Sequence, residues 1–203
     1  KSVYRTSHPL YSRFSAYYDS MEASVKKHTI VPSFMARSTG KAQTVELNWD
    51  GSRYAATLTD TNGVLSDYTF SSEQAGITFA TSGNTLTITA EAAPAETVTI
   101  SATKNNTRKG VVVWSDGHYG PDGTMQDVVT YSATISDPVK AYLNLKVSYG
   151  GAKIIKTSED GKVEGISFTI TGNGVNKTVT TGAGGVIQID NLAPGVYTVT
   201  DFQ

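Results

Sequence analysis

Two stretches of the sequence carry side chains that could take part in a reaction. The first is a run rich in Gly, Asp and Pro that places His118 between Asp116 and Asp122. Imidazole and carboxylate groups bind metals, but no second His or Glu lies at a ligand spacing from His118. No Ser stands in the Gly-flanked turn that a hydrolase nucleophile needs. We therefore expect a solvated loop, with no metal and no cofactor.

The second stretch contains a lysine, Lys156, in a strand-like run just before the acidic turn Ser158–Gly161. A lysine among apolar neighbours loses solvation, which favours its neutral, nucleophilic amine. A buried, protonated acid beside it could polarise an amide oxygen, and contact between the partners would make the step intramolecular. Alone, however, Lys156 is equally compatible with a solubility charge on an edge strand.

The composition excludes several classes of protein. The chain has 203 residues, 17 Lys plus Arg against 18 Asp plus Glu, and a formal net charge of -1. With no basic excess to neutralise phosphates, we expect neither a nucleic-acid partner nor docking on anionic lipid. The chain has no Cys, so it has no thiol of its own for catalysis, disulfides or metal binding. No run approaches the apolar length of a membrane span, so we expect no membrane insertion.

A helix is expected near the start, over about 9–28. Apolar and aromatic side chains recur at three- and four-residue steps from Leu10 to Val25, and Pro9 suits a first helical turn. The basic run Lys26–His28 suits the negative end of the helix dipole. We expect the aromatic stripe to pack against a core.

From Gln43 onward the apolar pattern changes to a period of two, with a Gly, Asn or Asp turn signal between most of the short runs. This pattern predicts a mostly β protein: an antiparallel β-sandwich or barrel after the helix, over 1–147. A Gly-containing linker follows at 148–151. A second, incomplete Ig-like or prealbumin-like β-sandwich is then expected over 152–203. The expected strands of the first part include 45–49, 54–59, 65–70, 77–79, 85–89, 98–102, 110–114 and 141–147.

The last quarter of the chain carries ordered motifs: Ala152–Lys156, Ser158–Gly161, Gly165–Phe168 and Gly184–Asp201. It closely resembles the start of a CnaB-type (prealbumin-like, SpaA-like) domain of Gram-positive surface proteins and pilins. In that family the Lys before the acidic turn forms an isopeptide bond with an Asn or Asp on the final strand, assisted by a Glu. The resemblance implies that Lys156 is the reactive lysine and that Asp201 stands where the Glu usually lies. The final strand with its Asn or Asp is not in this sequence.

The preceding part resembles the C-terminal portion of a thioester domain from the same class of adhesins. Four stretches carry this resemblance: Val31–Phe34, Tyr54–Ser66, Gly83–Ile88 and Met125–Val139. That family joins a Cys to a Gln in a hydrophobic-Gln-hydrophobic-hydrophobic motif, and Gln126 falls on this Gln, although Asp127 departs from the pattern. The Cys partner is absent from the chain. Because the sequence opens on Lys1 and stops at Gln203 within a strand-like pattern, we expect a fragment cut at both ends.

The resemblances imply a non-enzymatic function. We expect a fragment of an extracellular, cell-wall-anchored covalent adhesin whose thioester captures an amine of a host surface protein. The fragment itself is expected to be a monomer. Two other interpretations remain open: a purely structural pilin or stalk segment, and a non-covalent module that binds carbohydrate or protein. The latter would need an exposed aromatic face, drawn from Tyr54, Tyr68, Trp114 and Tyr119. An enzyme would instead need the side chains around His118 to converge in a cleft.

Overall fold

The computed structural model describes residues 6–114 and 128–201, except for the side chains of 112–114 and 128–132. Most of the described chain is β-strand, with one α-helix, α1 (Tyr11–Thr29), as expected. Short 3-10 turns lie at η1 (Thr39–Lys41), η2 (Leu65–Asp67) and η3 (Ala183–Gly185). The first strands are β1 (Thr44–Glu46), β2 (Asn48–Trp49), β3 (Tyr54–Thr59), β4 (Thr69–Ser72), β5 (Ile77–Ser82), β6 (Thr85–Ala90) and β7 (Val98–Lys104). The remaining strands are β8 (Thr107–Trp114), β9 (Val128–Ser136), β10 (Val139–Lys146), β11 (Gly150–Ile155), β12 (Ser167–Gly172), β13 (Val175–Thr180), β14 (Val186–Leu192) and β15 (Thr198–Asp201).

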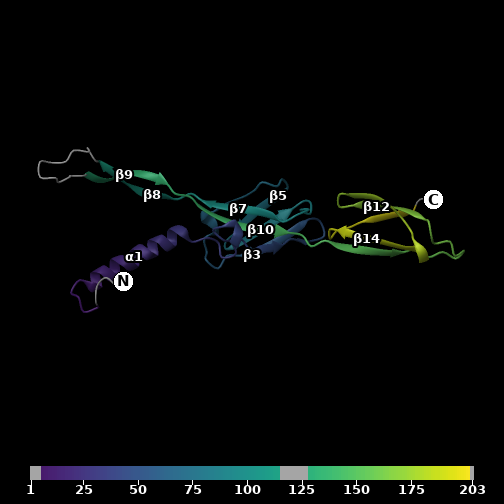
Figure 1. The fold of residues 1–203 in the computed structure, drawn as a ribbon, viewed down its shortest axis with the longest axis horizontal. Helices are drawn as coiled ribbons and strands as arrows, with labels where there is room; N and C mark the ends of the chain where they lie inside the picture. Colours follow the sequence, from purple (N-terminus) through teal and green to yellow (C-terminus); the bar gives the residue numbers. More distant parts are fainter. Residues whose placement is uncertain (1–5, 115–127, 202–203) are drawn as a thin grey trace.

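Two four-stranded sheets form the first unit, in the centre of Figure 1. Their strand orders are β1-β10-β7-β4 and β2-β3-β6-β5. The pairings are antiparallel except for β1 with β10, which is parallel. Neither sheet closes into a barrel over the described strands, so the sandwich, and not the barrel, is the architecture.

The alternating sequence pattern explains the core of this unit. Every second residue of β6 and of β10 is buried, because successive side chains of a strand point to opposite faces. The buried side chains meet between the two sheets. The largest fully buried ones include Tyr54, Leu47, Leu65, Leu86, Ile88, Ile100, Leu143 and Leu145.

One expected strand is divided between the two sheets. The alternation over 45–49 predicts a single strand, but β1 pairs with β10 in one sheet while β2 pairs with β3 in the other. Leu47 lies at the crossing, where it is almost fully buried and its N–H donates to the Lys146 carbonyl at 2.8 Å. The alternation persists across the crossing, so the local pattern cannot show that the strand changes partners.

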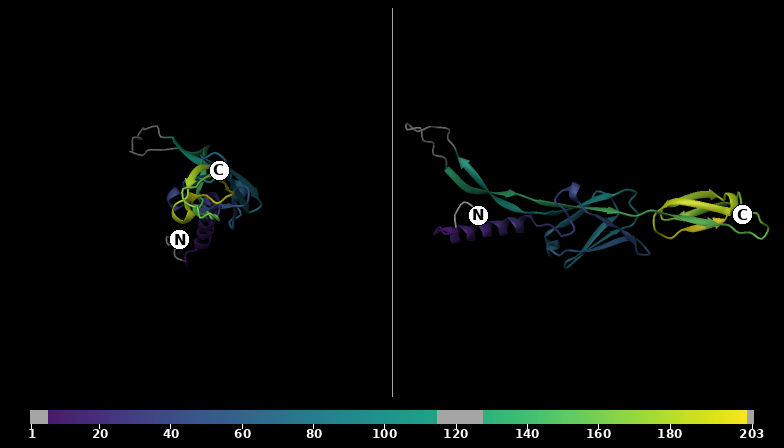
Figure 2. Two further views of the ribbon diagram at one scale, coloured as in Figure 1. Left: turned by 90° about the vertical axis from the view of Figure 1, so that its right-hand side faces the viewer. Right: turned by 60° about the horizontal axis from the view of Figure 1, so that its bottom comes forward.

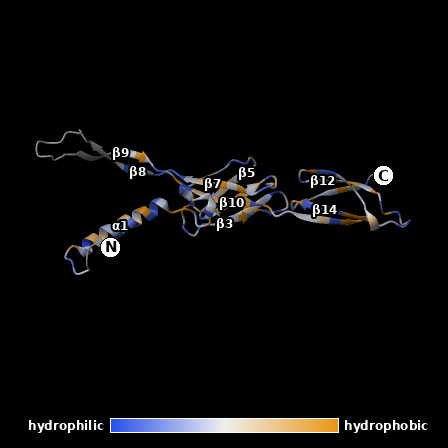
Figure 3. Cartoon of the chain, in the orientation of Figure 1, coloured by the Kyte–Doolittle hydropathy of each residue, from blue (hydrophilic) through white to orange (hydrophobic). Residues whose placement is uncertain are grey.

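Two elements project from the first unit on the side away from the second (Figures 1 and 2). One is the antiparallel ribbon of β8 and β9, paired from Thr107↔Ser136 to Trp114↔Val128. The other is α1, which has no buried residue, so the expectation that its apolar stripe packs against a core is wrong for the described residues. Tyr17 is 73% exposed, and Met21 and Val25 are also exposed. Figure 3 shows hydrophobic and hydrophilic positions alternating along α1, with no other element packed over the helix. A period of 3.6 predicts a helix and an apolar face, but not what covers that face.

A buried carboxylate attaches the chain after α1 to the first unit. Asp60 has no exposed surface, and its oxygens accept hydrogen bonds from the backbone N–H groups of Ser33 (2.7 Å), Asn62 (3.0 Å) and Val64 (2.7 Å). Burial raises the pKa of Asp60, but the three N–H donors outweigh it, so the pKa lies below its usual value. The negative charge is therefore retained inside the protein and organises two loops.

Two further side chains hold the residues just after α1. The Tyr68 hydroxyl donates to the Ile30 carbonyl at 2.6 Å, and burial raises the pKa of Tyr68 to about 12. The Asn62 amide donates to the Val31 carbonyl at 2.8 Å. Together with Asp60, these contacts determine where the C-terminal end of α1 meets the sheets.

The second unit has its own two sheets and core. β11 pairs with β14, and β12 pairs with β13 and with β15. Their inward faces bury Phe168, Ile170, Ile187 and Ile189, which form a cluster separate from the first core.

The described helix of the chain is not long and apolar enough to cross a membrane.

A tyrosine of the first unit is hydrogen-bonded into the second. The Tyr54 hydroxyl donates to the Pro194 carbonyl and accepts from the Asn173 side chain, both at 2.5 Å. Burial raises the pKa of Tyr54, so the phenol stays neutral and can make both bonds. From the connection between the units, the Tyr149 hydroxyl donates to the Pro94 carbonyl of the first unit at 3.1 Å. The two units are therefore held together by side chains as well as by the connecting backbone.

We predict that Asp60→Asn destabilises the protein by about 2–3 kcal/mol at pH 7, because the new amide group faces backbone N–H donors without accepting from all of them. The native carboxylate stabilises the fold fully above its unfolded pKa of about 4, and this stability is lost as the pH falls through the lower folded-state pKa. The variant should therefore lose less stability between pH 5 and pH 2 than the wild type. Urea unfolding at a series of pH values measures both effects.

Asp50→Asn is the matched control, since Asp50 also accepts backbone N–H groups, from Ser52 and Arg53, but in an exposed turn. Its effect should be much smaller. Equal destabilisation by the two substitutions would contradict the role given to Asp60.

We also predict that Tyr54→Phe loosens the two units relative to each other, because it removes the donor to Pro194 and the acceptor for Asn173. Residual dipolar couplings of the two units, fitted separately, should give one common alignment for the wild type and two different ones for the variant. Tyr68→Phe removes a buried hydroxyl of the same kind that does not bridge the units, and should keep a common alignment. A common alignment for Tyr54→Phe would contradict the prediction.

Candidate functional site

Lys156 directly follows β11 and is held in place by its backbone. Its N–H donates to the Gly185 carbonyl at 2.9 Å. Gly185 has a φ of +74°, and a Cβ there would lie 2.5 Å from the Lys156 carbonyl oxygen. Only glycine permits this close approach and this backbone conformation. The run of small residues before β14 is therefore what allows Lys156 to sit where it does.

Asp201 reaches the same place from the opposite sheet. It is the last residue of β15 and lies opposite Phe168 in the antiparallel register with β12. Lys156 Nζ lies 3.1 Å from Asp201 Oδ2 and 5.9 Å from the centre of the Phe168 ring. An amine from one sheet thus meets a carboxylate and an aromatic face from the other.

The pair is only partly shielded from water. The side chains of Lys156 and Asp201 are 30% and 33% exposed. A partly exposed ion pair contributes about 1 kcal/mol or less, and a cation near a ring face adds about 0.5–1 kcal/mol. The charges therefore stabilise the link between the two sheets modestly. The distance between Lys156 Nζ and Asp201 Oδ2 is that of a hydrogen bond between an ammonium and a carboxylate.

Among the residues that the structure describes, Asp201 is the one carboxyl or carboxamide within hydrogen-bond distance of Lys156 Nζ. The structure thus brings together the lysine and the acid that the sequence singles out. Sequence reasoning assigned no role to Phe168 or Gly185, although both lie in the motifs of this region. Two features of the sequence could have pointed to them. Phe168 is an aromatic residue in an alternating strand pattern, and Gly185 belongs to a pair of glycines just before the next strand.

The other candidate residues divide into two groups. Tyr54 and Tyr68 are buried, with 0% and 7% of their surface exposed, so an exposed aromatic face that uses them for binding is wrong. Their hydroxyls are polar, but their rings fill the core. Outside the described residues lie Gln126, Asp116, His118, Tyr119 and Asp122, and nothing is described of the Trp114 side chain. No group of three His, Asp or Glu that could hold a metal occurs within 6–114 and 128–201.

The second unit has the architecture of a prealbumin-like β-domain, and the comparison with protein families agrees. Residues 150–203 match the SpaA family, described as a prealbumin-like fold domain. No curated protein matches the chain. Among solved structures, the Bacillus anthracis TIE protein is similar at 16% identity and a TM-score of 0.38. The match covers 93% of this chain and 39% of that protein's chain.

Proposed function

We propose that the chain is a part of a surface adhesin or pilin-like protein and that its second unit is a stalk segment whose two sheets are linked at Lys156. The observation that carries this proposal is the 3.1 Å contact between Lys156 Nζ, at the end of one sheet, and Asp201, in the other. The SpaA match of residues 150–203 supports the class of domain.

The covalent step is an amide condensation. The neutral Lys156 amine attacks the side-chain carbonyl carbon of an Asn or Asp, and ammonia or water leaves as the amide bond forms. Protonated Asp201 donates to the carbonyl oxygen and takes part in returning a proton to the leaving group. In the family that this region resembles, the acyl partner belongs to a final strand that this sequence does not include. In this proposal Asp201, which lies 3.1 Å from Lys156 Nζ, acts as the assisting acid.

Such a bond suits a segment that carries load. Hydrogen bonds between strands yield one after another when the ends of a domain are pulled, whereas an amide between the first strand and the last carries the force covalently. The β11–β14 and β13-β12-β15 sheets then remain together under tension. The location that this function requires is extracellular, with anchoring to the cell wall.

For the first unit we propose covalent capture of an amine. The support is the Met125–Val129 pattern and the order of motifs around it. In the full protein, a Cys thiolate attacks the Gln126 carboxamide carbon and ammonia leaves, giving a thioester. An amine of a host surface protein then attacks the thioester, the thiolate leaves, and a stable amide remains. Each molecule reacts once, so this is attachment and not enzymatic turnover.

We predict a mass loss in a polypeptide that extends this chain through the family's final strand. Formation of the amide releases ammonia or water, so the intact mass should fall by about 17 Da with an Asn partner or 18 Da with an Asp partner. The present chain should keep its full mass. Asp201→Ala in the extended polypeptide should prevent or slow the loss, and intact-mass spectrometry over time measures it.

Lys156→Arg is the matched control, because it keeps the positive charge and removes the nucleophile. A mass loss that persists in Lys156→Arg, or that is absent from the extended polypeptide with Lys156, would contradict the stalk proposal.

We predict that the present chain, which has no Cys, gains no mass when it is incubated with a small primary amine such as methylamine. A longer polypeptide that supplies the Cys should gain the amine at Gln126, as located by peptide mapping. Gln126→Ala should abolish the adduct, while Gln74→Ala, at an exposed glutamine of the same unit, should not. An amine adduct on the chain without Cys would contradict the thioester chemistry.

A further inference from the structure

A hollow with a volume of about 450 Å³ lies on the outer face of the β1-β10-β7-β4 sheet, over β4, β7 and β10. The alternation of the strands accounts for its floor. Val139, Ala141, Leu143 and Leu145 of β10 are buried in the core, so the residues between them face outward. The hollow is therefore built on side chains of paired strands, which the sheet holds in fixed positions.

The register of the strands brings hydroxyl groups together on this floor. Tyr142 of β10 pairs with Ser101 of β7, and Ser101 pairs with Ser71 of β4. Side chains directly opposite each other in a sheet lie on the same face, with their Cβ atoms about 5 Å apart. The three side chains thus form one row across three strands, and the hydroxyls of Ser71 and Ser101 are hydrogen-bonded at 2.9 Å. We call this site the hydroxyl-lined hollow.

Two opposite charges line the hydroxyl-lined hollow on either side of this row. Lys140 precedes Tyr142 by two residues on β10, whereas Glu73 follows Ser71 by two residues, just after the end of β4. Because β4 and β10 both run antiparallel to β7, they run in the same direction, and the two charges lie on opposite sides of the row. One ammonium and one carboxylate balance, so the hollow does not select a charged ligand.

These two charged side chains are available for a ligand. Lys140 and Glu73 are exposed, and neither side chain has a hydrogen bond or ion pair within residues 6–114 and 128–201. The Tyr142 hydroxyl is likewise without a hydrogen bond in the part of the chain that the structure describes. An ammonium that donates, a carboxylate that accepts and a phenol that can do both thus line one hollow.

The lining of the hollow is suited to a ligand with many hydroxyl groups. Its polar side chains alternate with carbon surface, which the Tyr142 ring and the methyl groups of Thr39 and Thr99 supply. A sugar ring presents the same two kinds of surface, with hydroxyls around its rim and C–H groups on its faces. An acyl chain would need a continuous apolar lining, and a phosphate-rich ligand would need an excess of positive groups.

A strand of another protein is a less suitable occupant, because the backbone of the floor is already paired. β10 lies between β1 and β7, and β7 lies between β10 and β4. A peptide that extends a sheet needs a free edge with unpaired N–H and C=O groups. The central strands of the hollow offer side chains only, which favours a small ligand over an added strand.

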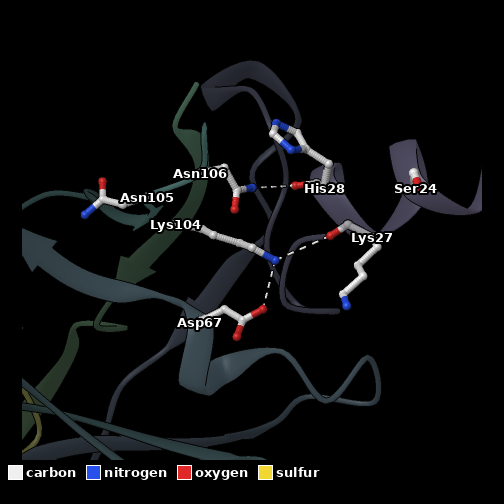
Figure 4. A pocket seen from close by; sticks show the side chains of 7 residues that line it. All are labelled: Ser24, Lys27, His28, Asp67, Lys104, Asn105 and Asn106. Carbon is white, nitrogen blue, oxygen red and sulfur yellow. Dashed lines mark hydrogen bonds and ion pairs between the residues drawn. The ribbon is translucent and has the colours of Figure 1, made fainter. Parts of the chain in front are cut away.

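A second hollow, where the C-terminal end of α1 meets the end of β7, differs in this respect (Figure 4). There Lys104 Nζ donates to the Lys27 carbonyl at 3.4 Å and pairs with Asp67 at 2.8 Å. Figure 4 shows the Asn105 side chain extending away from Lys27. The polar groups of that hollow hold the last turn of the helix and are not gathered around one ligand.

We propose that the hydroxyl-lined hollow binds an uncharged sugar, namely one or two hexose rings of a glycan. The C–H groups of a ring contact Tyr142, and the ring hydroxyls bond to Ser71, Ser101 and the Glu73 carboxylate. The 203-residue chain has no Cys and does not include the family's final strand, so neither covalent step proposed above takes place in it. Sugar binding by this chain therefore succeeds or fails independently of those steps.

The test is a titration of the ¹⁵N-labelled 203-residue chain, followed by NMR, with lactose, maltose, cellobiose and sorbitol. At least one of the three disaccharides should shift the backbone amides of Ser71, Ser101 and Tyr142 saturably, with a dissociation constant on the order of 1 mM. Sorbitol carries the same hydroxyl groups on an open chain. It should bind about tenfold more weakly or not at all, because it has no fixed C–H face and loses more conformational freedom on binding.

A second pair of probes, glucose and sodium glucuronate, tests the charge of the ligand. Glucuronate should bind no more tightly than glucose, because the Lys140 ammonium is balanced by the Glu73 carboxylate.

Glu73→Gln should weaken binding of the disaccharide by about fivefold, because the charge-assisted bond to a ring hydroxyl is lost while the side chain keeps its size. Glu91→Gln is the matched control, since Glu91 is also exposed and directly follows a strand, β6, but does not line the hollow. It should change the affinity less than about twofold. Tyr142→Leu should weaken binding about tenfold, because it removes the ring and its hydroxyl. Thermal unfolding of each variant checks that the fold is retained.

Four results would overturn the proposal. The first is the absence of saturable shifts at these amides with all three disaccharides up to about 50 mM. The others are an affinity for sorbitol equal to that for the best disaccharide, tighter binding of glucuronate than of glucose, and equal weakening by Glu73→Gln and Glu91→Gln. Tighter binding of glucuronate would show a site for an anion and not for an uncharged sugar.

Discussion

The buried negative charge of Asp60 is the constraint on which the arrangement of the first unit depends. A carboxylate without exposed surface must be compensated inside the protein, and here three backbone N–H groups provide the compensation. These donors come from the residues after α1 and from the turn after β3, so satisfying one charge positions two loops together. Loss of one donor would leave the buried charge with only two of its three N–H partners, which lowers the stability of the fold.

The direction of α1 follows from this constraint. The helix has no core of its own within the described residues, and its position depends on the contacts just after its last turn. Tyr68 and Asn62 hold the carbonyls of Ile30 and Val31, and this brings the last turn of the helix to Lys104. The apolar face of α1 and the β8–β9 ribbon project beyond that point. The position of α1 is thus determined by the buried carboxylate of Asp60, which lies some thirty residues further along the chain.

The two sheets of the second unit are held together in a different way. Its two sheets have a small common core of four buried side chains, and they are also linked by the Lys156–Asp201 pair at one place and by the backbone turns elsewhere. The hydrogen bonds of the Tyr54 hydroxyl with Pro194 and Asn173 then join this unit to the core of the first. The second unit thus combines a small core, an ion pair between its two sheets and a hydrogen-bonded junction with the first unit.

Local periodicity was sufficient to predict most of the strands, the helix over about 9–28 and the mostly β fold class, because a period of two or 3.6 reports the direction of successive side chains. It did not show that 65–67, the start of the strand expected over 65–70, forms the 3-10 turn η2, or that the strand expected over 45–49 is divided into β1 and β2. The motifs around Lys156 and Asp201 also marked these residues before the structure placed them 3.1 Å apart. Tertiary structure alone decided that Leu47 marks a change of sheet, that Tyr54 and Tyr68 are buried, and that the stripe of α1 is uncovered. It alone placed Lys104 beside Lys27, which lies 77 positions earlier in the chain. The physical reason is that these outcomes depend on which distant surfaces meet, and no local pattern of side-chain direction contains that information.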